Sequence, residues 1–576
     1  MMTLAPPPKA RVRRQSMRFL LVNPFYPVAE IPSPPLGISY LAAALERIGV
    51  EVRVLDLVVS ACDRRKLERI LDDFQPDIVG ATSVTMTFDS AISVIRSVKE
   101  IDPSIFTAMG GAHVSFCAEQ TLTKHPELDL VALGEGEETI VDIVRAFENG
   151  RDFSKVPGLT YRENGEIRTT GARGYWIDVD TLPVPSRHLV PLGRYRALDL
   201  PISMTTSRGC PFQCIFCTGR QLVGAKIRYR QAKSVVDEMQ HVASLGFKRL
   251  NLADDLFTAR KDHAHAVCDE ILARGLKVTW TSFSNVNTVD VPLLKKMKEA
   301  GCILVSFGLE SANADILKTV KKGTKIPKII EAVQMCNEAG VQPHGSFIIG
   351  LPGETPETLR ELHEFSRKLA DMGCETGVHM LAPFPGTAVY EQREKYGIKL
   401  LTDDWSQFHA NHAITENDAV SNEIQEAIAM EMEERAKQRF WDMAERIGNG
   451  TASAEDLETY YRVERHGVYY AVMMEDLLET DGSWDLRLGD TGSDDVEAAA
   501  IAELGARIHA RTEQKPDAIE RALRHGLKER FLRFDVEDGR CTWAWTDEGP
   551  SMKRSSDVAT LPHARTGGIG EVAASA

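Results

Sequence analysis

Three cysteines stand close together behind an apolar run, where Cys210, Cys214 and Cys217 form a C-x3-C-x2-C pattern. Cysteine thiolates are the usual ligands of iron–sulfur clusters, so three of them on one loop can hold three corners of such a cluster. A fourth cysteine at short spacing is missing, which would leave one iron open to a small molecule. A zinc site would need a fourth Cys or His in the same loop, and three buried structural cysteines would not explain the tight spacing.

The composition is that of a large, acidic protein. The chain has 576 residues, and 68 Lys and Arg against 83 Asp and Glu give a net charge of −15. We expect no nucleic-acid partner, because phosphate binding needs a basic surface. We also expect no integral membrane segment, since no apolar run approaches the roughly 18 residues that a membrane helix requires. The ten cysteines are mostly scattered, which fits reduced thiols in a cytoplasmic protein.

Alternating strand and helix patterns divide the chain into segments. Residues 17–150 contain five apolar runs separated by helix-like periodicity, which predicts an α/β, flavodoxin-like, doubly wound sheet. Residues 151–200 are predicted to be a Pro-rich linker, and residues 201–410 resume the alternation with the cysteine loop after the first strand. The alternation stops in residues 411–548, which predict a mostly helical C-terminal region. We expect a disordered arm and a disordered tail at the two ends, residues 1–16 and 549–576.

Ligands of a doubly wound sheet bind outside the carboxyl ends of its strands, so the turns there are the candidate binding loops. The turns after the third, fourth and fifth expected strands carry hydroxyl groups, a histidine, a carboxylate and glycines that permit close backbone approach. These candidate residues are Ser83, Thr85, Gly110, Gly111, His113, Gly134 and Glu135. A Gly-Gly pair after a strand is a weak signal by itself, and the competing interpretation is a sheet that binds nothing.

The cysteine loop, with Phe216 directly before the third cysteine, resembles the radical S-adenosylmethionine (radical SAM) superfamily. The resemblance implies a partial (β/α)6 barrel in residues 201–410. It also implies a 4Fe–4S cluster whose open iron binds the amino and carboxylate groups of SAM. The implied SAM contacts at later strand ends are Asp254 and Asp255 for the ammonium group, Glu310 and Ser311 for the ribose and carboxylate, and Gly350 and Gly353 for the adenine. For the two aspartates, a helix cap is the competing interpretation.

The binding loops of residues 17–150 resemble a cobalamin-binding domain, in which a Ser/Thr loop and a Gly-Gly loop hold the nucleotide tail of the cofactor. One departure is the absence of the D-x-H-x-x-G motif, whose histidine ligates cobalt. The resemblance therefore implies base-off cobalamin without a protein imidazole on the metal. We interpret His113 as a loop histidine packed against the corrin or its tail, with a replacement cobalt ligand as the alternative.

Both resemblances together imply a cobalamin-dependent radical SAM enzyme of the branch that contains methyltransferases and the anaerobic magnesium-protoporphyrin ester cyclase. The implied reaction is reductive cleavage of SAM to a 5′-deoxyadenosyl radical, with methyl transfer from methylcobalamin to an unactivated carbon. A small-molecule or natural-product substrate and an electron donor such as flavodoxin or ferredoxin are the implied partners. Two alternatives stay open, a cyclase or rearrangement enzyme without methyl transfer and a sensor without turnover.

Overall fold

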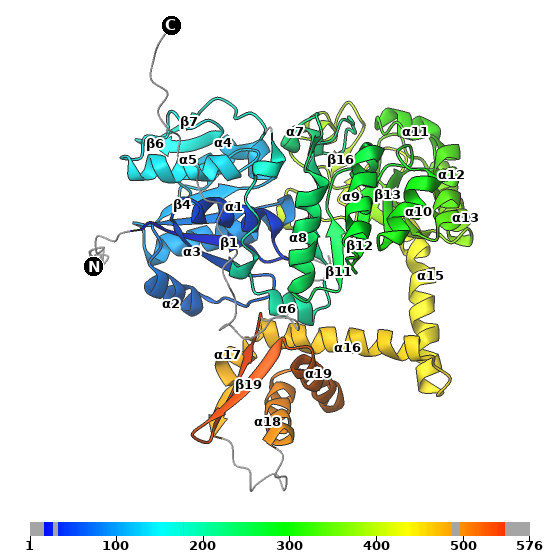
Figure 1. Cartoon of the computed structure of the whole chain (residues 1–576). Helices are drawn as coiled ribbons and strands as arrows, with labels where there is room; N and C mark the ends of the chain where they lie inside the picture. The colour runs from blue at the N-terminus through cyan, green and yellow to red at the C-terminus, as the bar shows by residue number, and fades with distance from the viewer. Residues whose placement is uncertain (1–15, 27–32, 177, 486–495, 548–576) are drawn as a thin grey trace.

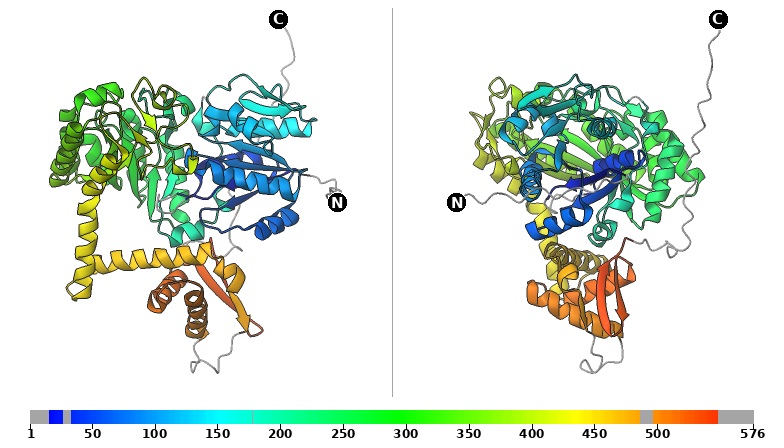
Figure 2. Two further views of the ribbon diagram at one scale, coloured as in Figure 1. Left: turned by 180° about the vertical axis from the view of Figure 1, so that it is seen from behind. Right: turned by 90° about the vertical axis from the view of Figure 1, so that its left-hand side faces the viewer.

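The computed structural model describes residues 16–26, 33–176, 178–485 and 496–547. The expected N-terminal arm, apart from residue 16, and the expected C-terminal tail lie outside these residues. Two α/β units stand side by side, and a C-terminal region lies beneath them (Figure 1). Figure 2 shows that α15 and α16 lead from the second unit to this region as two long, nearly perpendicular helices.

The N-terminal unit is built on a seven-stranded sheet in the order β2-β1-β3-β4-β5-β6-β7. Its first five strands are parallel: β1 (Arg18–Asn23), β2 (Glu51–Asp56), β3 (Ile78–Thr82), β4 (Phe106–Gly110) and β5 (Leu130–Ala132). One face is covered by α1 (Leu36–Glu46) and α5 (Glu137–Glu148), and the other by α2 (Arg64–Phe74), α3 (Phe88–Ile101) and α4 (Val114–Lys124). The predicted doubly wound sheet is confirmed.

Both faces of this sheet are buried, which explains the continuous apolar runs of its strands. In β1, Phe19 and Leu21 pack toward α1 and α5, whereas Leu20 and Val22 pack toward α2 and α3. The candidate binding loops follow the carboxyl ends of β3, β4 and β5.

The segment predicted to be a linker contributes two strands to the first sheet. β6 (Leu159–Glu163) and β7 (Glu166–Thr169) form a hairpin that extends the sheet antiparallel to β5. The turn at Asn164 and Gly165 is a local hairpin signal. The sequence does not show which sheet edge the hairpin joins, because that choice depends on packing far away in the chain.

The second unit is an open, parallel sheet in the order β15-β14-β13-β12-β11-β8, and it confirms the predicted partial barrel. Its strands are β8 (Ile202–Met204), β11 (Arg249–Leu252), β12 (Thr279–Ser284), β13 (Cys302–Glu310), β14 (Gln342–Ile349) and β15 (Glu375–Met380). Its larger helices are α8 (Ala232–Ser244), α9 (Lys261–Ala273), α10 (Val291–Glu299), α12 (Ile326–Ala339) and α13 (Pro356–Asp371). Trp280 of β12 is buried in the core with these helices, whereas Phe283 lies on the inner face and is 44% exposed.

The C-terminal region combines helices with a small antiparallel sheet. The helices are α15 (Asn422–Gly448), α16 (Ala454–Met474), α17 (Leu477–Asp481), α18 (Val496–Arg511) and α19 (Pro516–Lys528). The sheet has the order β18-β20-β19, with β18 (Ser483–Asp485), β19 (Leu532–Glu537) and β20 (Arg540–Trp545). The prediction of a mostly helical region missed this sheet, although Cys541 and Trp543 show the buried alternation of a strand.

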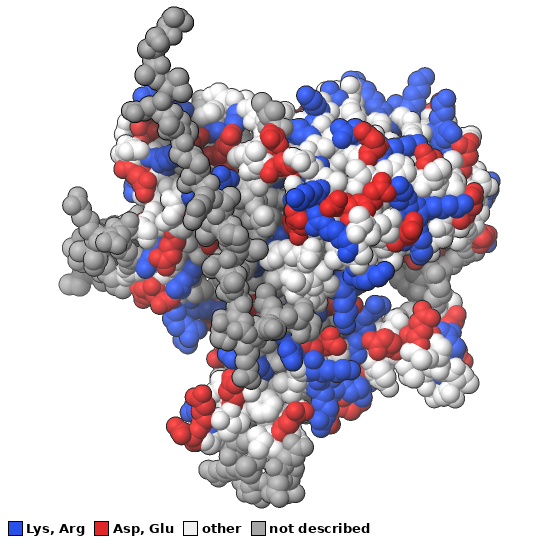
Figure 3. All heavy atoms as spheres, in the orientation of Figure 1, with Lys and Arg blue, Asp and Glu red and all other residues white. Residues whose placement is uncertain are grey.

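Charges of both signs are mixed on one face of the protein. On the face shown in Figure 3, Lys and Arg side chains are interspersed with Asp and Glu. That pattern differs from the clustered basic stripe of a nucleic-acid-binding surface. Among the described residues, no helix combines the length and apolar character needed to cross a membrane.

Candidate functional site

A short antiparallel ladder joins the two ends of the cysteine loop, and we call this point, with Arg208 and Arg228, the neck of the loop. β9 (Ser207–Arg208) pairs with β10 (Arg228–Tyr229), and Arg208 stands opposite Arg228. All three cysteines of the pattern lie between these two arginines. The ladder therefore fixes both ends of the loop at one point of the second unit.

The three thiols lie close enough to influence one another. Cys210 and Cys214 are half-buried and Cys217 is exposed, and all three are free. Burial, together with the neighbouring thiols, raises the pKa of Cys214 to about 11. Among the described residues, no group of three or more His, Cys, Asp and Glu side chains already has the arrangement of a metal site. Three convergent thiols without a fourth protein ligand fit an iron–sulfur cluster with one open iron.

Hydrophobic packing anchors the cysteine loop from one side. Ile215 and Phe216 pack with Ile316, Val320 and Leu351. The backbone N–H of Ile215 also donates a hydrogen bond to the carbonyl oxygen of Val320 at 3.2 Å. Phe216 is thus a packing residue in this structure, and its contact with a cofactor stays a prediction.

A buried Glu–Lys pair lies beside the cysteines. Glu310, at the end of β13, has a φ of +65°, which is uncommon for a residue with a Cβ. Its Oε1 accepts a hydrogen bond from Nζ of Lys322 at 2.6 Å, and the two side chains are 8% and 13% exposed. Burial raises the pKa of Cys214 and Cys217, and the Lys322 charge partly offsets that rise. A carboxylate accepts several hydrogen bonds, so Glu310 keeps acceptor capacity for ribose hydroxyl groups.

The two aspartates after β11 have different surroundings. Asp254 is 2% exposed, and its carboxylate accepts hydrogen bonds at 2.6 Å from the backbone N–H and the hydroxyl of Thr206 and from the hydroxyl of Ser207. Burial raises the pKa of Asp254 despite these bonds. Asp255 is less buried, and its charge acts on Cys210, whose pKa burial already raises. Asp254 therefore braces the start of the cysteine loop, which leaves Asp255 as the candidate ligand contact.

The predicted adenine-site turn is built around a buried carboxyl group. Gly350 has a φ of +97° and Gly353 a φ of +89°, in the left-handed region that favours glycine. The N–H of Gly350 donates a hydrogen bond to Oε2 of Glu354 at 2.7 Å. Ser311 accepts a hydrogen bond from the backbone N–H of Asn313 at 3.2 Å, at the start of α11 (Ala314–Thr319). Contacts of these glycines and of Ser311 with SAM stay predictions.

We expect Glu354 to make the protein less stable as the pH rises. Burial raises the pKa of Glu354 from 4.5 to about 8. The folded protein holds this proton more tightly than the unfolded chain does. The stabilisation is therefore complete below about pH 4.5 and is lost as the pH rises through about 8. Over that range, the unfolding temperature of Glu354→Gln should fall less than that of the wild type.

The matched control for this pH series is Glu357→Gln, because Glu357 begins the same helix α13 but is exposed. Hydrogen bonds from its own backbone N–H and from Thr355 lower the pKa of Glu357, so this residue titrates below the pH range of Glu354. Over the Glu354 range, the unfolding temperature of the control should change with pH in parallel with that of the wild type. A Glu354→Gln profile that is indistinguishable from the wild-type profile would show that the buried carboxyl is not neutral.

A cavity of about 240 Å³ lies at the carboxyl ends of the strands of the first unit. Gly110, Gly111, Gly134 and Glu135 line it together, as the binding-loop argument predicts. Gly111 has a φ of +105°, and a Cβ there would lie 2.4 Å from the carbonyl oxygen of Ser83, so this wall requires glycine. The volume is below the roughly 300–1,000 Å³ of whole small-molecule sites. The cavity therefore fits one part of a large cofactor, such as the aromatic end of a nucleotide tail.

The far wall of this cavity comes from the cysteine loop. Leu222 and Val223 of α7 (Gly219–Val223) line it, together with Arg208 at the neck. Helix α7 follows Cys217 almost directly in the chain. One short segment thus joins the candidate cluster site to the candidate cobalamin site.

Three of the predicted binding residues do not line this cavity. Ser83, Thr85 and His113 are buried in the packing beside it. The His113 ring lies 4.6 Å from the Phe88 ring and 4.9 Å from the Trp405 ring, and its Nδ1 is 3.3 Å from Oγ1 of Thr85. Burial lowers the pKa of His113 to about 4, so this side chain is neutral near pH 7. His113 is a packing residue in this structure, and its predicted packing against corrin or tail stays untested.

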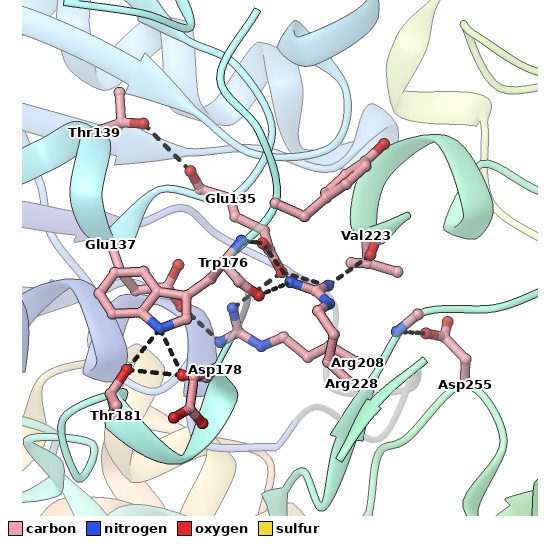
Figure 4. Close-up of polar contacts among 12 residues, drawn as sticks. Glu135, Glu137, Thr139, Trp176, Asp178, Thr181, Arg208, Val223, Arg228 and Asp255 are labelled. Carbon is pink, nitrogen blue, oxygen red and sulfur yellow. Dashed lines mark hydrogen bonds and ion pairs between the residues drawn. The ribbon is translucent and has the colours of Figure 1, made fainter. Parts of the chain in front are cut away.

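Glu135 pairs with the second unit as well as lining the cavity (Figure 4). Its carboxylate accepts hydrogen bonds from Arg228 at 2.9 and 3.0 Å, from Arg208 at 3.3 Å and from the backbone N–H of Trp176 at 2.8 Å. Glu137 accepts a further bond from Arg208 at 2.6 Å. The four charged side chains are between 6% and 14% exposed. Glu135 therefore has arginines as its main partners, which the prediction of a cofactor contact did not include.

Sequence reasoning missed the polar groups on the inner face of the second sheet. Ser306 Oγ lies 3.0 Å from Nδ1 of His344, and the Thr281 hydroxyl donates to the side-chain oxygen of Asn251 at 3.1 Å. These residues belong to β11, β12, β13 and β14, and only the strand register brings them together. Alternation of polar and apolar residues in each strand was the available signal, but it does not identify a shared site.

Comparisons with known proteins agree with this arrangement. A B12 binding domain model matches residues 28–144, and a radical SAM superfamily model matches residues 204–366. An uncharacterized methyltransferase of Pyrococcus horikoshii is 36% identical over 68% of this chain and 86% of its own. The anaerobic magnesium-protoporphyrin IX monomethyl ester cyclase of Cereibacter sphaeroides is 31% identical over 65% of this chain and 63% of its own. The cobalamin-dependent SAM radical enzyme OxsB has the same fold, with a TM-score of 0.64 and 17% identity over 89% of this chain and 84% of that chain.

A three-cysteine loop on a parallel partial barrel, beside a sheet of the B12-binding type, defines an enzyme of the radical SAM class. The chain belongs to the family of cobalamin-dependent radical SAM enzymes whose members include methyltransferases and magnesium-protoporphyrin ester cyclases. The predicted cofactors, SAM, a 4Fe–4S cluster and cobalamin, are confirmed as those of this family.

Proposed function

We propose that this enzyme transfers a methyl group to an unactivated carbon of a small-molecule substrate. When bound, the cluster and SAM supply a 5′-deoxyadenosyl radical, and cobalamin supplies the methyl group. The joint action of the two cofactors is supported by the wall that the cysteine loop and the cavity of the first unit share, and the 36% identity to a protein named as a methyltransferase favours methyl transfer. Two cofactor sites held by one loop can act on a single substrate without a large movement.

In this proposal, the residues of the chain bind the cofactors, orient them and shield them from water. Cys210, Cys214 and Cys217 hold the cluster, and Asp255 and Glu310 accept hydrogen bonds from the ammonium and ribose groups of SAM. Gly111 and its neighbours let the backbone approach the nucleotide tail of cobalamin. The packing around Phe216 excludes water from one side of the loop.

We also propose that cobalamin is bound without a protein imidazole on cobalt. The packing of His113 supports this proposal, because its ring is held between Phe88 and Trp405 and is absent from the cavity lining. His113→Gln should therefore leave the absorption spectrum of protein-bound hydroxocobalamin unchanged. A shift of the spectrum toward that of base-off cobalamin without a nitrogen ligand would identify His113 as a ligand after all.

The inner face of the second sheet supports a substrate that carries hydrogen-bonding groups. The Ser306–His344 and Asn251–Thr281 pairs present donors and acceptors there, beside the exposed ring of Phe283. Each of these side chains can form more than one hydrogen bond, so a substrate with polar groups can use the capacity that the two pairs leave open. We therefore propose a polar natural product or metabolite rather than a hydrocarbon.

The second candidate is ring formation or rearrangement without methyl transfer. It is supported by the 31% identity to the magnesium-protoporphyrin ester cyclase of Cereibacter sphaeroides. The same cofactor sites would serve both reactions, and the difference would lie in the fate of the substrate radical. The higher identity, 36%, to a protein named as a methyltransferase favours the first candidate.

One anaerobic assay separates the candidates. The reconstituted protein is incubated with SAM, a chemical reductant and candidate substrates, and the products are measured by mass spectrometry. A methylated product together with S-adenosylhomocysteine supports methyl transfer. Deoxyadenosine with an unmethylated, altered substrate supports the cyclase reaction, and the absence of both products would overturn both candidates.

We further propose a cytoplasmic flavodoxin or ferredoxin as the electron donor. All ten cysteines are free, which agrees with a reducing compartment. Reduced flavodoxin should support SAM cleavage in place of the chemical reductant. Cleavage with the chemical reductant but with neither protein donor would exclude this kind of partner.

A further inference from the structure

We propose that Glu135 is a positioning residue that couples the cobalamin cavity to the cluster loop, so that filling either site tightens the other. The inference rests on the proposed cofactor sites and concerns how they communicate. Glu135 belongs to the first unit, at the turn between β5 and α5, whereas its arginine partners belong to the second unit.

The two arginines are the neck of the cluster loop. Arg208 and Arg228 form a register pair of the β9–β10 ladder, and every residue between them belongs to the loop. The Glu135 carboxylate bonds to both arginines at once, with two oxygens on Arg228 and one on Arg208. One side chain of the first unit thus accepts hydrogen bonds from both arginines at the neck of the loop (Figure 4).

Arg228 also forms hydrogen bonds to the loop itself and to the segment that connects the two units. Arg228 donates a hydrogen bond at 2.6 Å to the carbonyl oxygen of Val223, and another at 2.6 Å to the carbonyl oxygen of Trp176. Val223 is the last residue of α7 and lines the cavity. A displacement of Glu135 would therefore be passed through Arg228 to the helix that follows the third cysteine.

The pairs are held in their charged form. Burial alone would raise the pKa of Glu135, but the Arg228 hydrogen bond, the Trp176 N–H and the Arg208 charge bring it below its usual value. A bidentate arginine–carboxylate pair also fixes the relative orientation of the two groups, which a single point charge does not do. A movement of the Glu135 carboxylate would therefore move the Arg228 guanidinium group with it.

Glu135, Glu137 and Arg208 all line the cavity, so a cofactor tail that fills it touches the residues that fix the neck. A cluster held by Cys210, Cys214 and Cys217 would, in turn, bind to the segment whose two ends are paired through Arg208 and Arg228. Two sites that order the same segment lower each other's cost of binding, which gives reciprocal coupling. A purely structural pair would change stability without linking the two affinities.

The test uses the full chain, purified anaerobically, either free of iron or with its cluster reconstituted. Hydroxocobalamin affinity is measured for both forms by equilibrium dialysis. In the wild type we expect the cluster-loaded form to bind hydroxocobalamin about tenfold more tightly, within the usual range of coupling. In Glu135→Gln we expect the iron-free and cluster-loaded forms to bind hydroxocobalamin with equal affinity, because the ion pairs with both arginines are lost.

Arg228→Lys is a second, milder variant that keeps the positive charge but loses the planar guanidinium group, which bonds to both carboxylate oxygens. This variant should lose most of the coupling, and it serves as the test if Glu135→Gln folds poorly. The control is Asp476→Asn, which breaks the Lys66–Asp476 ion pair between α2 and the residue preceding α17, far from the loop in sequence. The control should keep the wild-type ratio.

An unchanged affinity ratio in Arg228→Lys and Glu135→Gln would overturn the proposal, as would a wild type that binds both groups without coupling. A wild type that retains neither iron nor hydroxocobalamin would instead remove the cofactor sites themselves, and the coupling with them. The two failures are therefore distinguishable in the same set of measurements.

Discussion

Cys214→Ala is expected to abolish both iron retention and the formation of 5′-deoxyadenosine. Cys214 is the central residue of the three-cysteine pattern and the most strongly perturbed thiol of the loop, with a pKa raised to about 11 by burial. Two remaining thiolates cannot hold a cluster that needs three protein ligands and one open iron. Without the cluster no electron reaches SAM, so the loss of cleavage should be complete rather than partial. Iron analysis, the absorbance of the reconstituted protein and chromatography of deoxyadenosine measure the two effects.

The matched control is Cys62→Ala, because Cys62 is also a half-buried, free cysteine but lies outside the pattern, in the first unit. This variant should keep wild-type iron content and wild-type SAM cleavage. If Cys214→Ala still cleaved SAM, the assignment of the three cluster ligands would be wrong. Retention of one zinc per chain by the wild type would also contradict it.

The cluster loop could be predicted from the sequence because its signal is local. The spacing of Cys210, Cys214 and Cys217 identifies it without any knowledge of the fold, and the βα alternation identifies the two sheets. The same is true of Gly110, which ends β4, and of Gly111, which follows it; both line the cavity as expected. Local spacing and strand ends are the features that a sequence pattern records directly.

The contacts between the units could not be predicted, because they join residues far apart in the chain. Glu135 and Arg228 are separated by 93 residues, and neither belongs to a spacing pattern. A glutamate at a strand end has the same appearance in the sequence whether it binds a cofactor or an arginine. Only the packing of the two sheets decides between these roles.

Differences in burial give different roles to residues that look equivalent in the sequence. Asp254 and Asp255 are adjacent and chemically identical, yet one braces Thr206 and Ser207 while the other acts on Cys210. The direction of a side chain depends on the strand end and on its neighbours, which two identical letters do not record. For the same reason His113 matched a binding loop in sequence but is held in the packing beside the cavity.

Glu310→Gln is expected to weaken SAM binding by roughly ten- to hundredfold, since hydrogen bonds to charged groups contribute about 1.5–3 kcal/mol. The substitution keeps the size of the side chain and removes the charge that both Lys322 and the proposed ribose hydroxyls use. Lys322 would then be a buried cation without its carboxylate partner, now 2.6 Å away. Equilibrium dialysis of SAM against the anaerobically reconstituted protein measures the change.

Glu331→Gln provides the matched control for this experiment. Glu331 pairs with Lys328 at 2.5 Å, a Glu–Lys pair like that of Glu310, but both side chains are about half exposed, at 44% and 51%. Exposed pairs contribute little because water and salt screen them, so this variant should bind SAM like the wild type. Cluster content must be equal in all three proteins, which separates loss of the ligand contact from loss of the cluster. Equal SAM affinity in Glu310→Gln and Glu331→Gln would show that the carboxylate at the end of β13 serves Lys322 alone.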